Sequence, residues 1–133
     1  QATKGAYVLS DCEGVPEVIL IGTGSEVELC MQAADVLREQ GKRVRVVSMP
    51  CMELFFAQDE AYRESVLPAQ CKARVGVEAG SSFGWHRVVG DAGQLVCLDH
   101  FGASAPANVL FAQFGFTVEH VVEQAQKALE AAR

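Results

Sequence analysis

Runs of apolar residues separated by loops mark the strands of this chain. Residues 18–21 form an unbroken, mostly β-branched run, and similar segments follow at 44–47, 73–77 and 95–98. Continuous apolarity without alternation is typical of a strand that is covered on both faces. A further short extended segment, at residues 7–9, precedes these four.

Helical periodicity fills the stretches between the strands. Ser25 and Glu28 have the spacing of a capping box, and Gly41 supplies a left-handed stop at the other end of the same helix. Further helices are predicted at residues 55–66 and 85–89. Ser104 is expected to cap another helix, and Thr117 opens the last one.

Strands that alternate with helices imply right-handed crossovers, a parallel sheet and helices on both of its faces. The segment at 7–9 is different, because too few residues follow it for a helical crossover, so a pairing with the next strand would be antiparallel. We therefore predict one three-layer α/β domain over residues 1–133. Its five-stranded mixed sheet has four parallel strands and an antiparallel amino-terminal edge strand, with helices on both faces.

The charge and the cysteines exclude several classes of protein. Eleven basic and seventeen acidic residues give a net charge of −6, which weighs against nucleic-acid binding. No apolar run is long enough to cross a bilayer. Five cysteines without a C-x-x-C pair argue against zinc and a disulfide framework, and Cys30 and Cys97 are expected to act as small buried hydrophobes.

Because the chain begins at Gln1, we expect a piece of a longer protein. The basic segment at 42–45 is interpreted as a solvated turn.

Ligands of an open α/β sheet bind at the carboxyl ends of its strands. The residues of these loops that are candidates for ligand contact are Gly22, Thr23, Gly24, Ser25, Glu78, Gly80, Ser82 and Ser104. A lone carboxylate at a strand end acts as a general acid or base only where its surroundings change its affinity for a proton. For Glu78, hydrogen bonding to neighbouring backbone N–H groups is the simpler role. Trp85 and His86 are candidates for lining a pocket, but a core or interface tryptophan beside a surface histidine is the simpler interpretation.

The turn at residues 22–24 resembles the start of a dinucleotide fingerprint. Val27 stands where the third glycine belongs, and no acidic residue ends the next strand to hold a ribose. Glu26 and Glu28 in the first helical turn would also repel a phosphate. We therefore interpret the turn as structural.

The segment 80–84 matches the G-x-S-x-G of a nucleophile elbow, with Ser82 as the nucleophile. Asp99 and then His100 or His120 follow in the order of a catalytic triad. However, the predicted sheet lacks the strands and the oxyanion loop of such hydrolases. A serine hydrolase thus stays a remote alternative, and no residue is assigned to catalysis, cofactor or metal.

Several segments together resemble the third, carboxyl-terminal domain of transketolases. They occur in the order of that family, and they are YVL at 7–9 with PE at 16–17, IGTGSEV at 21–27, VVSMP at 46–50, Asp59, YRESVLP at 62–68, VEAG at 77–80, FGASAP at 101–106 and FGFT at 114–117. The resemblance covers the chain from about Gly5 to Leu129.

The resemblance implies a cytoplasmic homodimeric enzyme that uses thiamine diphosphate with magnesium or calcium. Transketolases move a two-carbon ketol unit from a ketose phosphate to an aldose phosphate in the pentose phosphate pathway, and their first and second domains hold the cofactor. The motifs of those domains are absent from this sequence. We therefore expect a non-catalytic structural domain whose partners are the amino-terminal and middle domains and a second subunit.

Two other interpretations stay open. Glycine-rich loops at the strand ends also suit a regulatory module that binds a small molecule. Related thiamine enzymes, namely dehydrogenase E1 components and deoxyxylulose phosphate synthase, carry a similar domain.

Overall fold

The computed structural model describes residues 4–79, 84–97 and 117–133. Its strands are β1 (Tyr7–Ser10), β2 (Val18–Gly22), β3 (Val44–Ser48), β4 (Arg74–Glu78) and β5 (Gln94–Cys97). Its helices are α1 (Glu26–Glu39), α2 (Met52–Phe56), α3 (Glu60–Val66), α4 (His86–Val89) and α6 (Val118–Ala131).

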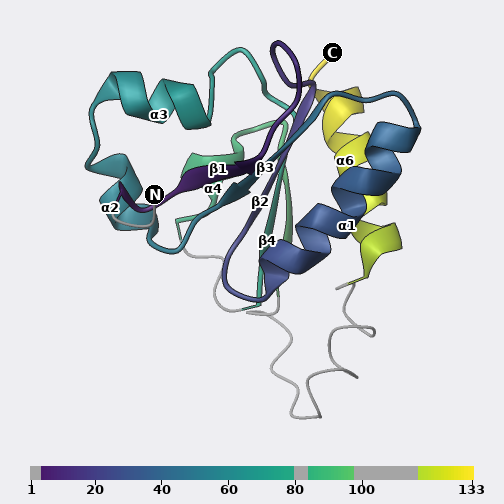
Figure 1. Ribbon diagram of the computed structural model, residues 1–133, viewed down its shortest axis with the longest axis horizontal. Coiled ribbons are helices and arrows are strands. Elements are labelled where there is room, and N and C mark those ends of the chain that lie inside the picture. The colour runs from purple at the N-terminus through teal and green to yellow at the C-terminus, as the bar shows by residue number, and fades with distance from the viewer. Residues whose placement is uncertain (1–3, 80–83, 98–116) are drawn as a thin grey trace.

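The five strands form one sheet in the order β1-β3-β2-β4-β5, with α1 and α6 on one face and α2, α3 and α4 on the other (Figure 1). The pairs β2–β3, β2–β4 and β4–β5 are parallel, and β1 is antiparallel at one edge. This confirms the predicted three-layer α/β fold. The partner of β1 is β3, however, and not β2, which follows it in sequence. β2 already has β3 and β4 on its two sides, so it offers no open edge to β1.

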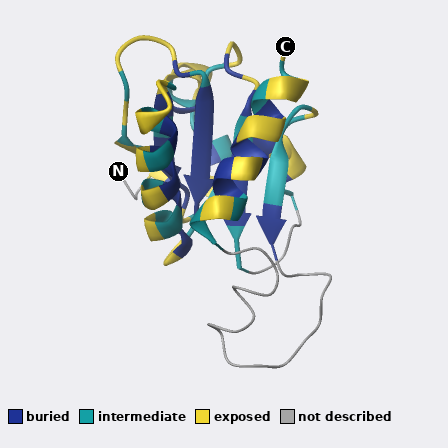
Figure 2. Ribbon diagram, turned by 90° about the vertical axis from the view of Figure 1, so that its right-hand side faces the viewer, coloured by how far each residue is buried: buried dark blue, intermediate teal, exposed yellow. Residues whose placement is uncertain are grey.

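Alternate residues of β2 enter two separate hydrophobic clusters. Val18 and Leu20 pack toward α1 and α6, whereas Ile19 and Ile21 pack toward α2, α3 and α4. All four are fully buried, as Figure 2 shows for the central strands. An apolar run without alternation therefore did indicate burial on both faces. Cys30 and Cys97 are buried as well, in agreement with their predicted role as small hydrophobes.

Two predictions of local structure were wrong. The Ser25 side chain makes no capping hydrogen bond, because the Ser25 backbone is helical and the Glu28 N–H donates to the Ser25 carbonyl instead. The Ser25 hydroxyl donates to Glu26 Oε2 at 2.9 Å. The helix predicted at 55–66 is two helices, α2 and α3, separated by residues 57–59. Asp59 Oδ1 accepts from the Tyr62 backbone N–H at 2.9 Å and starts α3 there.

Other local predictions are confirmed. Gly41 has a φ of +85° after α1, as a left-handed stop requires. Thr117 caps α6 by accepting from the His120 N–H at 3.1 Å. The helix expected after Ser104 lies outside the described residues. None of the described helices is both long and apolar enough to span a bilayer.

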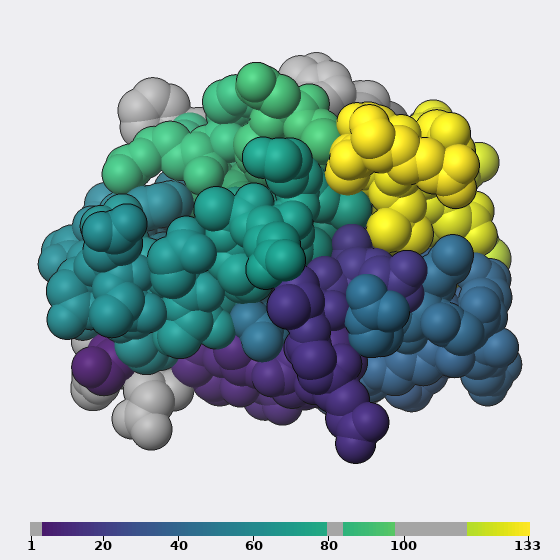
Figure 3. Space-filling model, turned by 90° about the horizontal axis from the view of Figure 1, so that it is seen from above, coloured from purple at the N-terminus to yellow at the C-terminus, as the bar shows by residue number. Residues whose placement is uncertain are grey.

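The amino ends of the parallel strands meet residues 15–17 and the end of α6, and Figure 3 looks onto this end of the molecule. A shallow cavity of about 470 Å³ lies here. Its basic lining residues are Lys42, Arg43, Lys72 and Arg133, and Glu17 is its carboxylate.

Candidate functional site

The carboxyl ends of β2 and β4 bring two of the candidate residues together. These strands are parallel neighbours, with Gly22 opposite Val77, so the next residue of each strand lies at the same edge. Thr23 Oγ1 donates to Glu78 Oε1 at 2.9 Å. The sequence named both residues but did not pair them. The signal that could have paired them is the adjacency of β2 and β4, which depends on strand order.

A cavity of about 440 Å³ opens at this edge. Its lining residues are Thr23, Met49, Pro50, Cys51, Met52, Glu53, Glu78 and Trp85. The residues that line it after β3, from Cys51 to Glu53, were not singled out by the sequence. The described lining holds two carboxylates and no basic side chain, so its charge disfavours an anionic ligand.

The turn from β2 into α1 offers few free donors to a phosphate. The backbone N–H groups of Glu26, Val27 and Glu28 donate to the carbonyls three residues earlier, at 3.0, 3.3 and 3.3 Å. Those N–H groups are the ones that hold a phosphate at a helix amino terminus. Glu26 is also nearly buried, with 7% of its surface exposed, and it adds negative charge there. The structural interpretation of residues 22–25 is therefore supported.

Gly22 is needed for packing rather than for a ligand. A Cβ at this position would lie 3.0 Å from Cys30 Sγ and 3.1 Å from the Val27 backbone. The absent side chain lets α1 approach β2 closely. The same packing buries Cys30, and burial together with the Glu26 carboxylate raises the pKa of its thiol to about 12. Cys30 is consequently a poor nucleophile at neutral pH.

The proposed triad is only partly within the described residues. Gly80, Ser82, Asp99, His100 and Ser104 all lie outside them. His120 is described; it lies in the first turn of α6, with its Nδ1 3.4 Å from Glu123 Oε1. Its nearest ionic partner is thus a carboxylate on its own helix.

Trp85 is buried and His86 is exposed, as the sequence predicts. Trp85 is 2% exposed, whereas the His86 side chain is exposed and its Nε2 lies 3.0 Å from Asp91 Oδ1. In the described ranges no three histidine, cysteine or acidic side chains gather in a way that could hold a metal ion.

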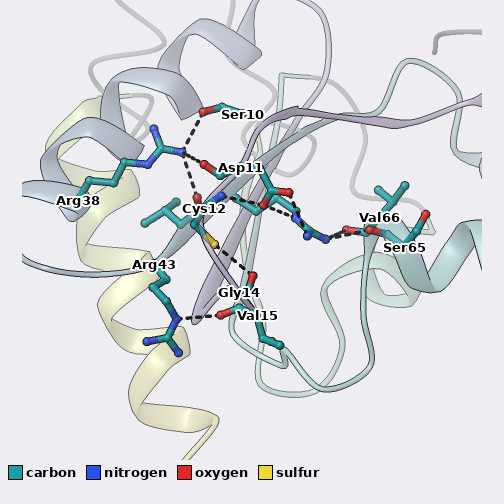
Figure 4. A network of polar contacts seen from close by, with 11 residues as sticks. Ser10, Asp11, Cys12, Gly14, Val15, Arg38, Arg43, Ser65 and Val66 are labelled. Carbon is teal, nitrogen blue, oxygen red and sulfur yellow. Dashed lines mark hydrogen bonds and ion pairs between the residues drawn. The ribbon is translucent and has the colours of Figure 1, made fainter.

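The basic segment at 42–45 is a solvated turn only in its first half: Arg43 is exposed, whereas Val44 and Arg45 belong to β3. Arg45 is 11% exposed, and it donates to the Asp11 carboxylate at 2.9 Å and to the carbonyls of Ser65 and Val66 at 3.0 Å. Arg38 binds Ser10 Oγ, and Arg43 binds the Val15 carbonyl, each at 2.9 Å (Figure 4). These arginines fix the loop after β1 against the rest of the fold.

Comparison with known proteins now adds to this geometry. The family model described as "Transketolase-like TK C-terminal domain" matches residues 5–117. The chain belongs to this family. The transketolase C-terminal domain described here is 52% identical to a transketolase of Nostoc sp. over 126 residues, which are 95% of this chain and 19% of the relative. It is 57% identical to Transketolase 7 of Craterostigma plantagineum over 129 residues, 94% of this chain and 19% of that protein.

The solved structures agree on the fold. Transketolase from Leishmania mexicana superposes with a TM-score of 0.87 at 44% identity, over 97% of this chain and 18% of that one. A structure named "Split gene transketolase, inactive beta4 tetramer" shares the fold at a TM-score of 0.76 and 21% identity, over 98% of this chain and 44% of that one. The transketolase C-terminal domain thus spans about a fifth of the curated relatives that it matches.

Proposed function

We propose that this chain works as the carboxyl-terminal domain of a transketolase. In the complete enzyme it supports the subunit fold and the contact with a second subunit, and it supplies no catalytic group. The ketol transfer itself belongs to amino-terminal and middle domains that bind thiamine diphosphate and magnesium or calcium. The observation that carries the proposal is the match to transketolases over nearly the whole chain. It is supported by the described residues at the carboxyl ends of the strands, among which no catalytic groups converge.

The described residues do not fit thiamine diphosphate. Its diphosphate needs cations, free N–H groups or metal ligands, whereas the cavity at the carboxyl edge is lined by Glu53 and Glu78. The first N–H groups of α1 already have acceptors. We therefore place no step of the reaction on this chain.

A transketolase is favoured over the related thiamine enzymes by the identity of the relatives. Proteins at 52–57% identity carry the name transketolase, and the family model carries it too. A regulatory ligand at the glycine-rich turn is disfavoured because the N–H groups of that turn are used internally.

The first test measures the binding of thiamine diphosphate and magnesium to the chain alone by isothermal titration calorimetry, together with an assay of ketol transfer. We expect no saturable heat and no ketol transfer. A complete transketolase serves as the positive control under the same conditions. Saturable micromolar binding, or turnover by the 133 residues, would refute the proposal.

The second test is a chimera. This chain replaces the matching domain of the Nostoc transketolase, and the same enzyme without that domain is the control. We expect the chimera to form dimers and to transfer ketol units, and the truncated control to lose dimer stability. A truncated enzyme as stable and dimeric as the chimera would contradict the assembly role.

A further inference from the structure

Three arginines from three different elements line one small cavity on the α2–α4 side of the sheet. Arg63 comes from α3, Arg74 is the first residue of β4, and Arg87 lies on α4. The cavity has a volume of about 230 Å³. In Figure 3 the green segment that contains α4 lies against the teal segments that contain α2 and α3.

Arg74 is a half-buried cation that is held by carbonyl groups alone. Its guanidinium donates at 2.8–3.2 Å to the carbonyl oxygens of Leu67, Pro68, Cys71 and Val88. Burial lowers the pKa of this side chain, although an arginine still keeps its proton at neutral pH. Carbonyl dipoles orient the guanidinium but carry no net charge. The Glu64 carboxylate acts on Arg74 electrostatically but forms no ion pair with it.

The other two guanidinium groups also lack a carboxylate partner among the described residues. Arg63 Nε donates to the Gln58 carbonyl at 3.1 Å. The Arg87 guanidinium stacks on the Phe56 ring, 3.9 Å from its centroid. Hydrogen bonding and stacking therefore hold both side chains in place at this cavity without pairing their charges.

Among the described residues, Glu64 is the one carboxylate that lines the cavity. Both oxygens of Glu64 accept from the Ala69 N–H, at 3.2 and 3.3 Å. The lining thus carries three positive charges against one negative charge. This balance is opposite in sign to the chain as a whole, whose net charge is −6. Concentrated charge of one sign in a concave site attracts ligands of the other sign.

We propose that this arginine pocket, formed by Arg63, Arg74 and Arg87, binds the phosphate group of a small phosphate monoester. Guanidinium groups bind phosphate oxygens through charge-assisted hydrogen bonds. Toward the described part of the chain Arg63 uses only its Nε–H, so its other N–H groups can donate to a phosphate. Arg74 donates four of its five N–H groups to carbonyls and adds mainly its charge. Pockets for drug-sized ligands start at about 300 Å³, so this smaller cavity suits a ligand of only a few carbon atoms. Phe56 and Leu67 supply the apolar wall for its carbon chain. The pocket is separate from the carboxyl edge and does not depend on the function proposed above.

The basic cavity at the amino ends of the strands is a weaker anion site and a useful comparison. Arg43 lies 3.8 Å from Glu17 Oε1, and Arg133 lies 3.7 Å from Glu130 Oε2. Their charges are therefore partly paired. Lys42 at the same cavity provides a matched control, since its removal deletes one positive charge from the protein without touching the arginine pocket.

The experiment follows the side-chain Nε–H resonances of the arginines in the ¹⁵N-labelled chain by NMR during titration with glycerol 3-phosphate. We expect saturable shifts of the Arg63, Arg74 and Arg87 signals, with a dissociation constant in the micromolar to millimolar range. Glycerol, the same molecule without phosphate, should leave these signals unchanged.

Two variants decide whether the pocket is the site. Arg87→Gln and Arg63→Gln should each weaken binding by about tenfold or more, because each deletes a charged hydrogen-bond donor. Lys42→Gln should change it by less than about twofold, as expected for a distant surface charge. The proposal is overturned by an absence of saturable shifts, by unchanged binding in Arg87→Gln and Arg63→Gln, or by an equal loss in Lys42→Gln. Arg74 is left intact because its four carbonyl contacts make it part of the fold.

Discussion

At the scale of single residues, Gly76 shows how one missing side chain shapes the core. It lies in the middle of β4 and faces the ring of Trp85. A Cβ at Gly76 would lie 2.7 Å from Cε3 and 2.9 Å from Cζ3 of that ring. The indole therefore occupies the space that any side chain at Gly76 would need, and the missing side chain lets Trp85 pack closely against β4.

We expect Gly76→Ala to destabilise the domain by about 1–3 kcal/mol, the usual cost of overpacking a core. The measurement is urea unfolding followed by circular dichroism. Gly14→Asn is the control, because nothing lies within 4 Å of that position and asparagine tolerates the left-handed φ of +74° found there. Equal stability of Gly76→Ala and the unsubstituted protein would show that Trp85 moves aside freely.

At the scale of elements, a single carboxylate divides the segment between β3 and β4 into two helices. Asp59 has an extended backbone and caps α3 with its side chain. The cap gives the chain a new helix start three residues after α2 ends at Phe56. Two short helices can follow the twisted sheet more closely than one straight helix, and both deliver apolar side chains to the same cluster.

Asp59→Ala is expected to cost about 1 kcal/mol of stability through the lost cap, whereas Asp59→Asn should stay within a few tenths because asparagine caps equally well. Thermal and urea unfolding of the two variants measures the difference. If alanine and asparagine gave the same loss, the negative charge of Asp59 would matter and not its hydrogen bond.

A second element-scale contact ties the loop after β1 to β3 through Asp11 and Arg45. Burial works to raise the pKa of Asp11, but hydrogen bonds from Arg45 and from the Cys12 backbone N–H outweigh it, so the pKa lies below its usual value. A carboxyl group whose pKa is lower in the folded state stabilises the fold above its unfolded pKa. That contribution is lost as the pH falls through the folded pKa. Because the Asp11 side chain is 46% exposed, solvent screening limits the effect to about 1 kcal/mol or less.

We therefore expect Asp11→Asn to be less stable than the unsubstituted protein at pH 7, and the difference to shrink below about pH 4, where the carboxylate becomes protonated. Urea unfolding across this pH range measures it. A difference that stays constant down to pH 3 would mean that the ion pair with Arg45 contributes nothing.

At the scale of the whole molecule, one sheet holds two hydrophobic clusters together. Trp85 belongs to the cluster under α2–α4, and Cys30 belongs to the cluster under α1 and α6. Every residue of β2 is buried, and alternate residues belong to the two clusters. Displacing β2 would therefore expose both clusters at once. The two sides of the domain should consequently unfold as one cooperative unit.

Two probes test this coupling in urea. Trp85 is the single tryptophan of the chain, so its fluorescence reports the α2–α4 side. Alkylation of Cys30, identified by peptide mass spectrometry, reports the α1–α6 side, where the buried thiol reacts only after exposure. We expect coincident midpoints. Labelling of Cys30 at a lower urea concentration than the loss of Trp85 fluorescence would reveal two separate units.

Local patterns account for most of what could be predicted. The strands at 18–21, 44–47, 73–77 and 95–98 agree with β2 to β5 within one residue at each described end, because unbroken apolar runs carry their own signal. Leu98 lies outside the described residues. The Ser25 capping box was wrong because Ser25 itself has a helical backbone, so the Glu28 N–H donates to its carbonyl and not to its side chain. The break at Asp59 was missed because helical periodicity continues across it.

By itself, the sequence determined the fold class, the burial of the central strands and the membership of the transketolase C-terminal domain family, since all three depend on residue types at fixed spacing along the chain. Only the tertiary structure decided that β1 pairs with β3, that Thr23 meets Glu78, and that Arg63, Arg74 and Arg87 share a cavity. These residues are separated along the chain, and the order of strands and the packing of helices bring them together. A pattern of neighbours in sequence cannot contain that information, because it arises from which surfaces remain open once the sheet has formed.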